Sequence, residues 1–372
     1  MRTLRTTVSA AVLVALCAGC ASGNLPALRK ARGSSDSATT YRWTELHPST
    51  SPIGRDSALF VYDAATSNIV MTGGESGCSG GHVTDFLDTW TWSGRSWTLQ
   101  HPSTVGPVAV DVPAGYDPAT KKVVAVIGVA CAMSTFHDDW DGSNWSGPLD
   151  NRGSCDSAGN QCQTEIYPDV AGSIADDPRT GQFLLWSPDP ANDWNSPSQP
   201  AAGTTTWSFN GTSWTLLQPA SQPTSEVGPE LMAYDAAIGK VVLYGEYTRR
   251  MWTWDGSTWT ELPPDPGAPS ARADSSMAYD TKLGKLVLFG GATVTGYVLG
   301  PSGPSYSDAT PLRDTWTWDG TGWKRLKLPI SPTPRYRAQM AYDAQTGMIV
   351  LFGGSLNSSV DGSDTWEFGE TG

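Results

Sequence analysis

The sequence predicts an all-β fold made of six repeats of one four-stranded unit, and two observations predict it. The 372 residues include 40 Gly, 27 Pro and 17 Trp but only 16% charged residues, a composition typical of many short strands joined by frequent turns. A Tyr-Asp pair or a variant of it recurs six times, each time between two short apolar runs. Each unit is too thin to bury its own aromatic side chains, so we expect the units to pack against one another.

The first twenty residues have the form of an export signal. Arg2 and Arg5 precede the apolar run Val8–Leu16, whose nine residues are too few to span a bilayer. Small residues then lead to Cys20. This pattern resembles the bacterial lipoprotein signal, which implies cleavage before Cys20 and lipidation of that cysteine. The alternative is an ordinary secretory signal that is cut nearby.

The next twenty residues predict a tether. Gly, Ser, Ala and Thr surround a short basic run there, and no periodic apolar face is present. We therefore expect residues 1–19 to be a signal peptide, residues 20–40 a flexible tether and residues 41–372 the folded domain. The domain would lie on the extracytoplasmic face of the cell membrane, anchored by lipid or else secreted.

The charge balance excludes one class of partner. The chain has 24 Lys and Arg against 37 Asp and Glu, a formal net charge of −13. A surface this acidic repels phosphate backbones, so we expect no nucleic-acid partner.

The first two strands of each unit, a and b, are defined by two aligned columns. Strand a ends in a Tyr or its substitute, followed by Asp. The first column is Tyr62, Tyr116, Asp176, Tyr234, Tyr279 and Tyr342. Ten residues beyond each Asp lies the second column, Gly73-Gly74, Ile127-Gly128, Ser187-Pro188, Gly245-Glu246, Gly290-Gly291 and Gly353-Gly354. A turn and an apolar strand b separate the two columns in every unit.

The third and fourth strands, c and d, carry the tryptophans. In the segment Met251–Trp259, alternation places Trp252 and Trp254 on one face of strand c and Thr253 on the other. An Asp-Gly, Asn-Gly or Ser-Gly pair then supplies the positive φ of a tight hairpin. Fifteen of the 17 Trp fall in these c and d columns. Their regular recurrence predicts that they form the core rather than a binding site.

The chain begins with the strand that its last unit lacks. The sixth unit stops after strand c, at Asp364–Gly372, whereas residues 41–50, YRWTELHPST, match the strand d of other units. The letters WTEL recur at Trp259–Leu262. We predict that the opening strand pairs beside Trp366–Phe368 and closes a six-bladed β-propeller without exposed sheet edges.

The double glycine after strand b and the Trp on strand d resemble the kelch repeats of galactose-oxidase-like propellers. The resemblance covers residues 41–372, although units two to four lack the double glycine. It implies a ligand site at the channel mouth, seven residues before the repeated Tyr. That column holds Arg55, Ala109, Asp169, Val227, Arg272 and Arg335. Kelch arginines here can contact acidic ligands, which implies an anion or peptide site. The alternative is that each arginine bonds loop carbonyls or a neighbouring carboxylate.

One face of the predicted ring varies and the other does not. The a-to-b and c-to-d turns are nearly uniform in length, whereas the b-to-c loops and d-to-a crossovers differ widely. Scaffolds usually carry function on variable loops. We call this side the loop face and expect any binding there. Trp194, Tyr297 and Tyr306 lie in its long loops, whose Gly, Ser, Pro and Asn composition suits recognition of sugar or peptide.

Four cysteines lie on the loop face as well. In an exported protein they allow three pairings. Cys78 and Cys131 follow the glycine column in neighbouring units, while Cys155 and Cys162 lie in one crossover. We favour the bonds Cys78–Cys131 and Cys155–Cys162, and the alternative is free or differently paired thiols.

No catalytic or metal constellation is evident. His47, His82, His101 and His137 map to the loop face but lack ligand spacing, so we expect no metal and no cofactor. The copper site of the galactose-oxidase enzymes cannot be placed on these residues. The acids of the repeated Asp-Thr-Trp triplets, Asp88, Asp314 and Asp364, recur too regularly to be catalytic. Asp138 and Asp169 are a possible acid-base pair.

These features favour a binding module. We expect a monomeric propeller whose loop face recognises a glycan or protein of the cell envelope without chemistry of its own. The alternative function is a secreted carbohydrate-active enzyme, an oxidase or hydrolase, that uses acids and aromatics from the same loops.

Overall fold

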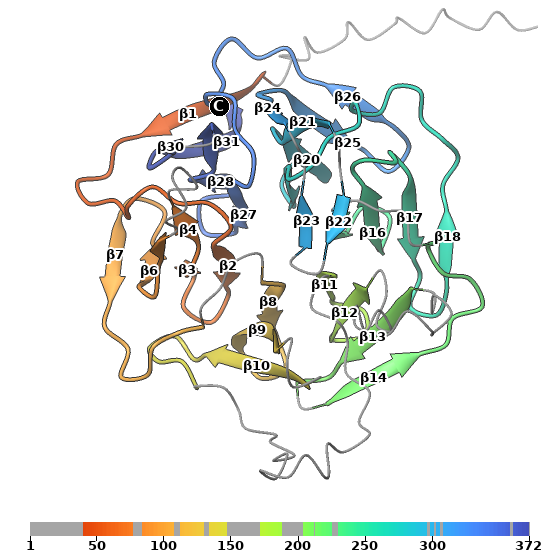
Figure 1. Ribbon diagram of the computed structural model, residues 1–372, viewed down its shortest axis with the longest axis horizontal. Helices are drawn as coiled ribbons and strands as arrows, with labels where there is room; N and C mark the ends of the chain where they lie inside the picture. Colours follow the sequence, from red (N-terminus) through yellow and green to blue (C-terminus); the bar gives the residue numbers. More distant parts are fainter. Residues whose placement is uncertain are drawn as a thin grey trace, which may run out of the picture. The chain divides into compact units, whose positions relative to one another are not determined.

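The protein is an all-β ring of six blades (Figure 1). The computed structural model describes residues 40–76, 84–107, 112–129, 134–146, 172–187, 204–211, 213–224, 230–295, 298–300, 303–305, 308–357 and 360–371. The compact unit is Thr40–Gly372; residues 1–39 of the expected signal and tether lie outside the described residues, and Thr40 is the first residue of β1. Within the described ranges no helix has the length and apolar character to cross a membrane.

Each blade is an antiparallel sheet whose strands run in sequence order from the centre outward, apart from the sixth, which takes its outer strand from the amino terminus. The first blade is β2 (Leu59–Asp63), β3 (Asn68–Thr72), β6 (Thr89–Trp92) and β7 (Trp97–Gln100). The second is β8 (Ala114–Asp117), β9 (Lys122–Val129) and β10 (Ser134–Trp140). The third is β11 (Ser173–Asp177), β12 (Gln182–Ser187), β13 (Thr205–Phe209) and β14 (Trp214–Leu217).

The remaining blades repeat the same order. The fourth is β15 (Glu230–Asp235), β16 (Lys240–Gly245), β17 (Met251–Trp254) and β18 (Trp259–Glu261). The fifth is β19 (Ser276–Asp280), β20 (Lys285–Phe289), β25 (Thr315–Trp318) and β26 (Trp323–Arg325). The sixth is β27 (Gln339–Asp343), β28 (Met348–Phe352), β31 (Thr365–Thr371) and β1 (Thr40–Leu46).

Short hairpins extend from the loops between the second and third strands of three blades. The first blade carries β4 (Glu75–Ser76) and β5 (Thr84–Asp85), and the sixth carries β29 (Ser355–Asn357) and β30 (Val360–Asp361). The fifth carries two pairs, β21 (Ala292–Thr295) with β24 (Asp308–Pro311) and β22 (Val298–Gly300) with β23 (Gly303–Ser305).

The predicted closure of the ring is confirmed. Strand β1 pairs antiparallel with β31 along its whole length, from Tyr41 opposite Glu370 to Leu46 opposite Thr365. The two ends of the compact unit therefore share one sheet. The second blade departs from the regular pattern, because an isolated bridge between Trp140 and Trp145 stands where the other blades have a paired fourth strand.

The repeated aspartates build the turns between the first two strands. In all six blades the carboxylate accepts the N–H of the residue two positions later, as in Asp63 to Ala65 and Asp343 to Gln345, both at 2.9 Å. The residue four positions after each Asp has a positive φ and is Gly in four of the six turns. Asp at the start and Gly near the end suit this turn because the short carboxylate satisfies the backbone and Gly tolerates positive φ.

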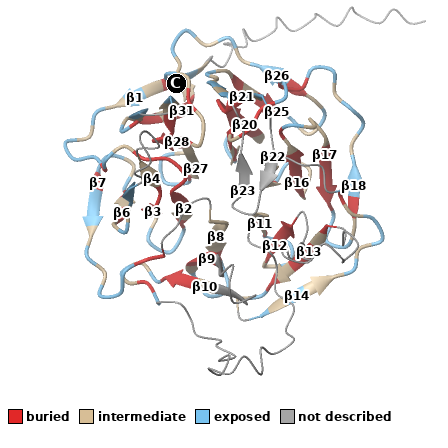
Figure 2. Cartoon of the chain, in the orientation of Figure 1, coloured by how far each residue is buried: buried red, intermediate tan, exposed pale blue. Residues whose placement is uncertain are grey.

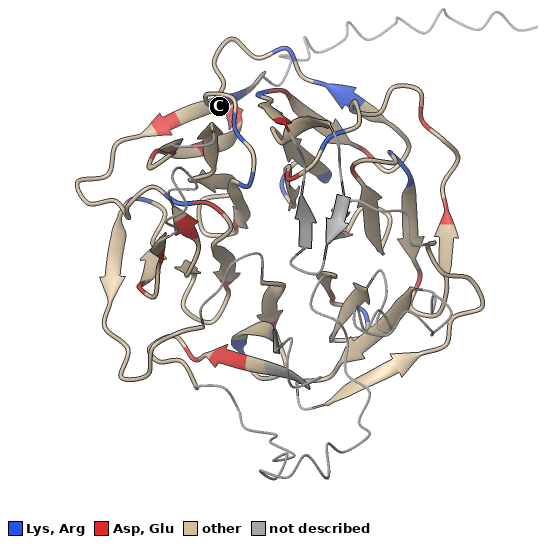
Figure 3. Ribbon diagram, viewed as in Figure 1, with Lys and Arg blue, Asp and Glu red and all other residues tan. Residues whose placement is uncertain are grey.

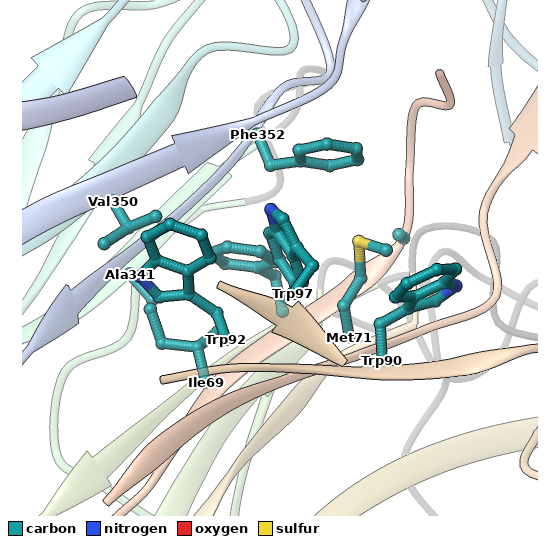
Figure 4. Close-up of a cluster of buried hydrophobic side chains, with 10 residues drawn as sticks. Ile69, Met71, Trp90, Trp92, Trp97, Ala341, Val350 and Phe352 are labelled. Carbon is teal, nitrogen blue, oxygen red and sulfur yellow. The ribbon is translucent and has the colours of Figure 1, made fainter. Parts of the chain in front are cut away.

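Tryptophans hold neighbouring blades together. The outer-strand indole N–H donates to a threonine on the third strand of the preceding blade, each time at 2.9 Å, in the pairs Trp97–Thr365, Trp145–Thr89, Trp259–Thr206 and Trp43–Thr315. Figure 4 shows Trp97 lying between Trp92, which also belongs to the first blade, and Phe352, which belongs to the sixth. Buried residues concentrate in the inner strands, whereas most residues of the outer strands β7 and β18 are exposed or half-buried (Figure 2).

The closing strand should contribute strongly to stability through Trp43. This side chain is 1% exposed and packs on Phe289 of the fifth blade and Phe368 of the sixth. We expect Trp43→Ala to lower the free energy of unfolding by about 3–5 kcal/mol, as for other buried aromatics. Denaturant titration measures it, with the exposed neighbour Arg42→Ala as control. Equal effects of the two changes would show that β1 does not hold the ring.

Candidate functional site

An arginine and an aspartate form a buried ion pair on the loop face of the fifth blade. Arg272 donates from Nη1 to Asp314 Oδ1 at 2.9 Å and from Nη2 to Asp314 Oδ2 at 3.0 Å. Its remaining bonds reach the carbonyls of Gly290 at 2.8 Å and Ser270 at 3.0 Å and the Ser270 hydroxyl at 3.3 Å. The Trp316 indole N–H donates to Asp314 Oδ2 at 2.7 Å. The Arg272 side chain thereby links the start of the innermost strand to the double glycine and to the start of the third strand.

The same arrangement recurs in the first and sixth blades, and we call it the clasp. Arg55 bonds Asp88 at 2.6 and 3.0 Å and the Gly73 carbonyl at 3.0 Å. Arg335 bonds Asp364 at 2.7 and 2.6 Å and the Gly353 carbonyl at 2.8 Å. Trp90 and Trp366 donate to the two aspartates as Trp316 does to the third.

The double glycine lets the next blade dock against the clasp. A Cβ on Gly290 would lie 2.6 Å from the carbonyl oxygen of Arg335, and one on Gly353 would lie 2.3 Å from that of Arg55. The N–H groups of Gly291 and Gly354 donate to these same carbonyls at 2.9 Å. Only glycine permits this approach, which connects the fifth blade to the sixth and the sixth to the first.

The sequence predicted a ring of basic groups at the channel mouth, but in the clasps the arginines are buried and the aspartates are partly exposed. The three arginine side chains are 0% exposed, whereas those of Asp88, Asp314 and Asp364 are 31%, 11% and 25% exposed. Burial opposes ionisation of the three carboxyls, but the hydrogen bonds and charge of the arginines prevail and lower their pKa values. Acidic and basic positions are interspersed around the ring (Figure 3). The group that each clasp presents to solvent is therefore a carboxylate.

In the structure, the three arginines of the channel-mouth column bond backbone carbonyls and neighbouring carboxylates. Contact of Arg55, Arg272 and Arg335 with a ligand stays a prediction, and it would require a clasp to open. The sequence contained the signal for the clasp. Arginine, double glycine and Asp-Thr-Trp occur together in units one, five and six and are absent together from the other three.

The other predicted site residues are not brought together among the described residues. Asp169, Trp194, Tyr297, Tyr306, Cys20 and the cysteines Cys78, Cys131, Cys155 and Cys162 lie outside them, as does His82. His47 and His101 are exposed. No group of three side chains suited to a metal occurs within the described ranges.

His137 and Asp138 occupy core columns of the second blade. The His137 ring packs on Phe209 of the third blade, with centroids 5.2 Å apart, and its Nδ1 lies 2.8 Å from Asp139 Oδ1. Asp138 is 1% exposed and accepts the Ser146 hydroxyl at 3.0 Å. This placement does not offer Asp138 to a substrate.

Sequence reasoning missed a buried acidic contact between the first and sixth blades. The Ser355 hydroxyl contacts Asp56 Oδ2 and lies 2.7 Å from Asp361 Oδ1. A hydroxyl carries one hydrogen, so the Ser355 hydroxyl donates to only one of the two carboxylates at a time. Burial, with the nearby charges of Asp361 and Glu75, raises the pKa of Asp56 to about 6, although Ser355 and Arg337 oppose the shift. Asp56 and Ser355 are 299 residues apart, and no local pattern signals the contact.

An arginine next to this contact spans three blades. Arg337 of the sixth blade reaches Asp274 of the fifth, with Nε 2.9 Å from Oδ2, and Glu75 of the first, with Nη1 3.7 Å from Oε1. Both Arg337 and Asp274 have positive φ, 54° and 56°. Asp274 and Arg337, two positions after the clasp arginines Arg272 and Arg335, thus form a second, more exposed ion pair, whereas Ser57 occupies the equivalent position after Arg55.

A cavity of about 20 Å³ lies on the loop face between the third and fourth blades. Its principal lining residues are Trp186, Thr224, Glu230, Leu243, Arg250 and Trp252. A second cavity, of about 70 Å³, lies between the same two blades and is lined by residues that include Asp177, Gln182, Ser208 and Trp254. Both described cavities occur where neither blade has a clasp.

Comparison with known proteins supports the fold. No protein-family model matches the sequence, and no curated protein matches it. The solved structure of YjhT is similar, with 11% identity over 86% of this chain and 96% of its own and a TM-score of 0.52. A protein of unknown function from Dyadobacter fermentans has 8% identity over 89% of this chain and 98% of its own, with a TM-score of 0.51. At these identities the similarity shows the propeller fold alone.

The clasp should be worth far more than an exposed ion pair. We expect Asp314→Asn to lower the free energy of unfolding by about 3–5 kcal/mol, because it leaves the Arg272 charge buried without a partner. The control is Glu261→Gln, which removes a partly exposed pair with Arg250 and should cost about 0–1 kcal/mol. Denaturant titration at pH 7 compares them.

The same titrations at lower pH test the sign of the Asp314 contribution. Because the folded-state pKa of Asp314 is lowered, its contribution is present above the unfolded pKa of about 4 and is lost as the pH falls further. The difference between the wild type and Asp314→Asn should therefore shrink below about pH 4. A difference that is equally small at pH 7 would contradict the clasp.

Asp56 should make the protein less stable as the pH rises. Its folded-state pKa is raised to about 6, so the folded protein holds an extra proton between the unfolded pKa, about 4, and that value. The contribution of Asp56 to the free energy of unfolding is therefore complete below about pH 4 and is lost as the pH rises through about 6. Asp56→Asn should flatten the decline and raise the melting temperature at pH 7.5, while Glu45→Gln, at an exposed position of β1, should change neither. A wild-type-to-variant difference that is constant from pH 4 to 7 would contradict this.

Proposed function

We propose that this protein is a binding module whose loop face recognises a glycan or protein of the cell envelope. Its repeats are kelch repeats, and it is held on the extracytoplasmic face of the membrane by lipid at Cys20. The observation that carries the binding role is the position of the clasps relative to the hairpins. In each clasped blade the hairpin loop starts directly after the double glycine and ends three residues before the clasp aspartate, as from Ser355 to Asp361.

The clasps therefore fix both ends of three neighbouring loops. Loops with fixed ends lose less conformational entropy when they bind a ligand, and this favours recognition. The kelch assignment is supported by the roles of its two signature features, since the double glycine receives the next blade and the outer-strand Trp bonds the preceding one.

A carbohydrate-active enzyme is not favoured by the placement of the two glutamates in the fourth blade. Hydrolysis of a glycosidic bond generally uses two carboxyl groups that face one substrate. Glu230 and Glu246 interact in the fourth blade, but Glu246 is 0% exposed and its Oε1 accepts the Ser275 N–H at 3.0 Å. Glu230 lines the cavity between the third and fourth blades without a second carboxyl among its described lining residues.

A pull-down tests the function and the class of ligand. We expect the mature protein, residues 20–372, to retain material from an envelope extract. Periodate treatment of the extract should abolish retention if the ligand is a glycan, and protease treatment should abolish it if the ligand is a protein. No retention from untreated extract, or turnover of a panel of glycans, would overturn the proposal.

The lipid anchor is tested separately. Cells grown with labelled palmitate should label the wild-type protein but not Cys20→Ser, and the variant should appear in the soluble fraction. Label that persists in the variant would exclude anchoring at this cysteine.

A further inference from the structure

One residue that lines the cavity between the third and fourth blades, Trp186, has a buried hydrogen-bond donor without a partner. Trp186 is 1% exposed, and its Nε1 makes no hydrogen bond. Most buried indoles of the described chain do have one, such as Trp259, which donates to Thr206, and Trp366, which donates to Asp364. An unsatisfied buried N–H is costly, and a ligand oxygen beside it would remove the cost.

A carboxyl group lines the same cavity. Glu230 begins the innermost strand of the fourth blade. Burial, and secondarily the charge of Glu246, raise the pKa of Glu230 well above its usual range. The shift favours the protonated form of the carboxyl, which both donates and accepts hydrogen bonds.

The one basic side chain among the described lining residues already has partners. Arg250 donates from Nε to Glu261 Oε1 at 2.5 Å and from Nη1 to Thr224 Oγ1 at 3.2 Å, and its guanidinium lies 5.5 Å from the centre of the Trp252 ring. Glu261 balances the Arg250 charge, so the cavity does not favour an anion. With a protonated Glu230 it does not favour a cation either.

The remaining surface is aromatic and hydroxylic. Trp252 provides an indole surface, and Thr224 and Thr248 provide hydroxyls. The loop that follows β16 is short and adds no hairpin, since β17 begins six residues after Gly245. The volume of about 20 Å³ admits one group the size of a water molecule or a hydroxyl. The rest of a larger ligand would lie outside the cavity, on the loop face.

We propose that this cavity binds a hydroxyl group of a neutral sugar, with the Trp186 N–H and the Glu230 carboxyl as its hydrogen-bonding partners. The sugar ring lies against the Arg250–Trp252 rim. This inference rests on the proposed function, because it gives the glycan-recognising module its first contact point.

Titration of the full-length mature protein with methyl glycosides, followed by NMR or calorimetry, tests the site. The probes are the methyl α-glycosides of glucose, galactose and mannose, with glucuronic acid and glucosamine as charged comparisons. We expect at least one neutral glycoside to bind and both charged sugars to bind at least 10-fold more weakly. Trp186→Phe removes the N–H and should weaken binding by about 3–10-fold, the effect of one hydrogen bond.

The pH dependence separates a contact with sugar from a purely structural role. Wild-type affinity should fall as the pH is raised and Glu230 ionises. Glu230→Gln keeps a donor and an acceptor, so it should bind at neutral pH within about 3-fold of wild type and lose the pH dependence. Glu230→Leu should abolish binding. Gln182→Ala, in the cavity at the other end of the same blade junction, is the control and should bind like wild type. Thermal unfolding of every variant confirms that it is folded.

Two outcomes would overturn the inference, and they differ in what they say of the proposed function. If neutral glycosides bind but Trp186→Phe and Glu230→Leu bind equally well, the sugar site lies elsewhere, and glycan recognition stands without this cavity. If neither glycosides nor envelope extract bind the wild type, both proposals fail.

Discussion

The main-chain pairing between β1 and β31 is the constraint on which the rest of the structure depends. It is the point at which a linear array of blades becomes a ring, and it leaves the sixth blade built from both ends of the compact unit. A ring has no terminal blade, so the aromatic faces of every blade can be covered by a neighbour. Trp43 of the sixth blade contributes to this cover, since it packs on Phe289 of the fifth blade and its indole N–H donates to Thr315 there.

The clasps are concentrated around the seam, by which we mean the sixth blade and its junctions with the fifth and first blades. The three clasped blades are the fifth, sixth and first, and the backbone of each clasp arginine in the sixth and first blades sits on the double glycine of the blade before it. The seam is thus joined at three levels, by β1 pairing, by indole-to-threonine bonds and by interlocked clasps on the loop face. Blades two to four, which follow one another along the chain, lack the clasp, and both described cavities lie among them.

Electrostatic pairing decides what the loop face offers a ligand. Each clasp buries its arginine and leaves the aspartate partly exposed, so a column that looks basic in the sequence contributes no positive surface. Asp56, Asp361 and Glu75 add acidic groups near the same seam, balanced in part by Arg337. These charged groups lie away from the junction of blades three and four, where Trp186 and Glu230 lie and where we propose that neutral hydrogen-bonding groups bind a ligand.

The sequence by itself determined the number of blades, the order of their strands, the closing role of YRWTELHPST and the core role of the tryptophans, because each depends on local periodicity repeated six times. Only the tertiary structure decided what the polar residues do. Arg272 and Asp314 lie in one blade and belong to a set of residues that recurs in three units, whereas Asp56 and Ser355 are 299 residues apart and meet only because the first and sixth blades stack. Polar contacts between blades depend on that stacking, and no short sequence pattern marks them.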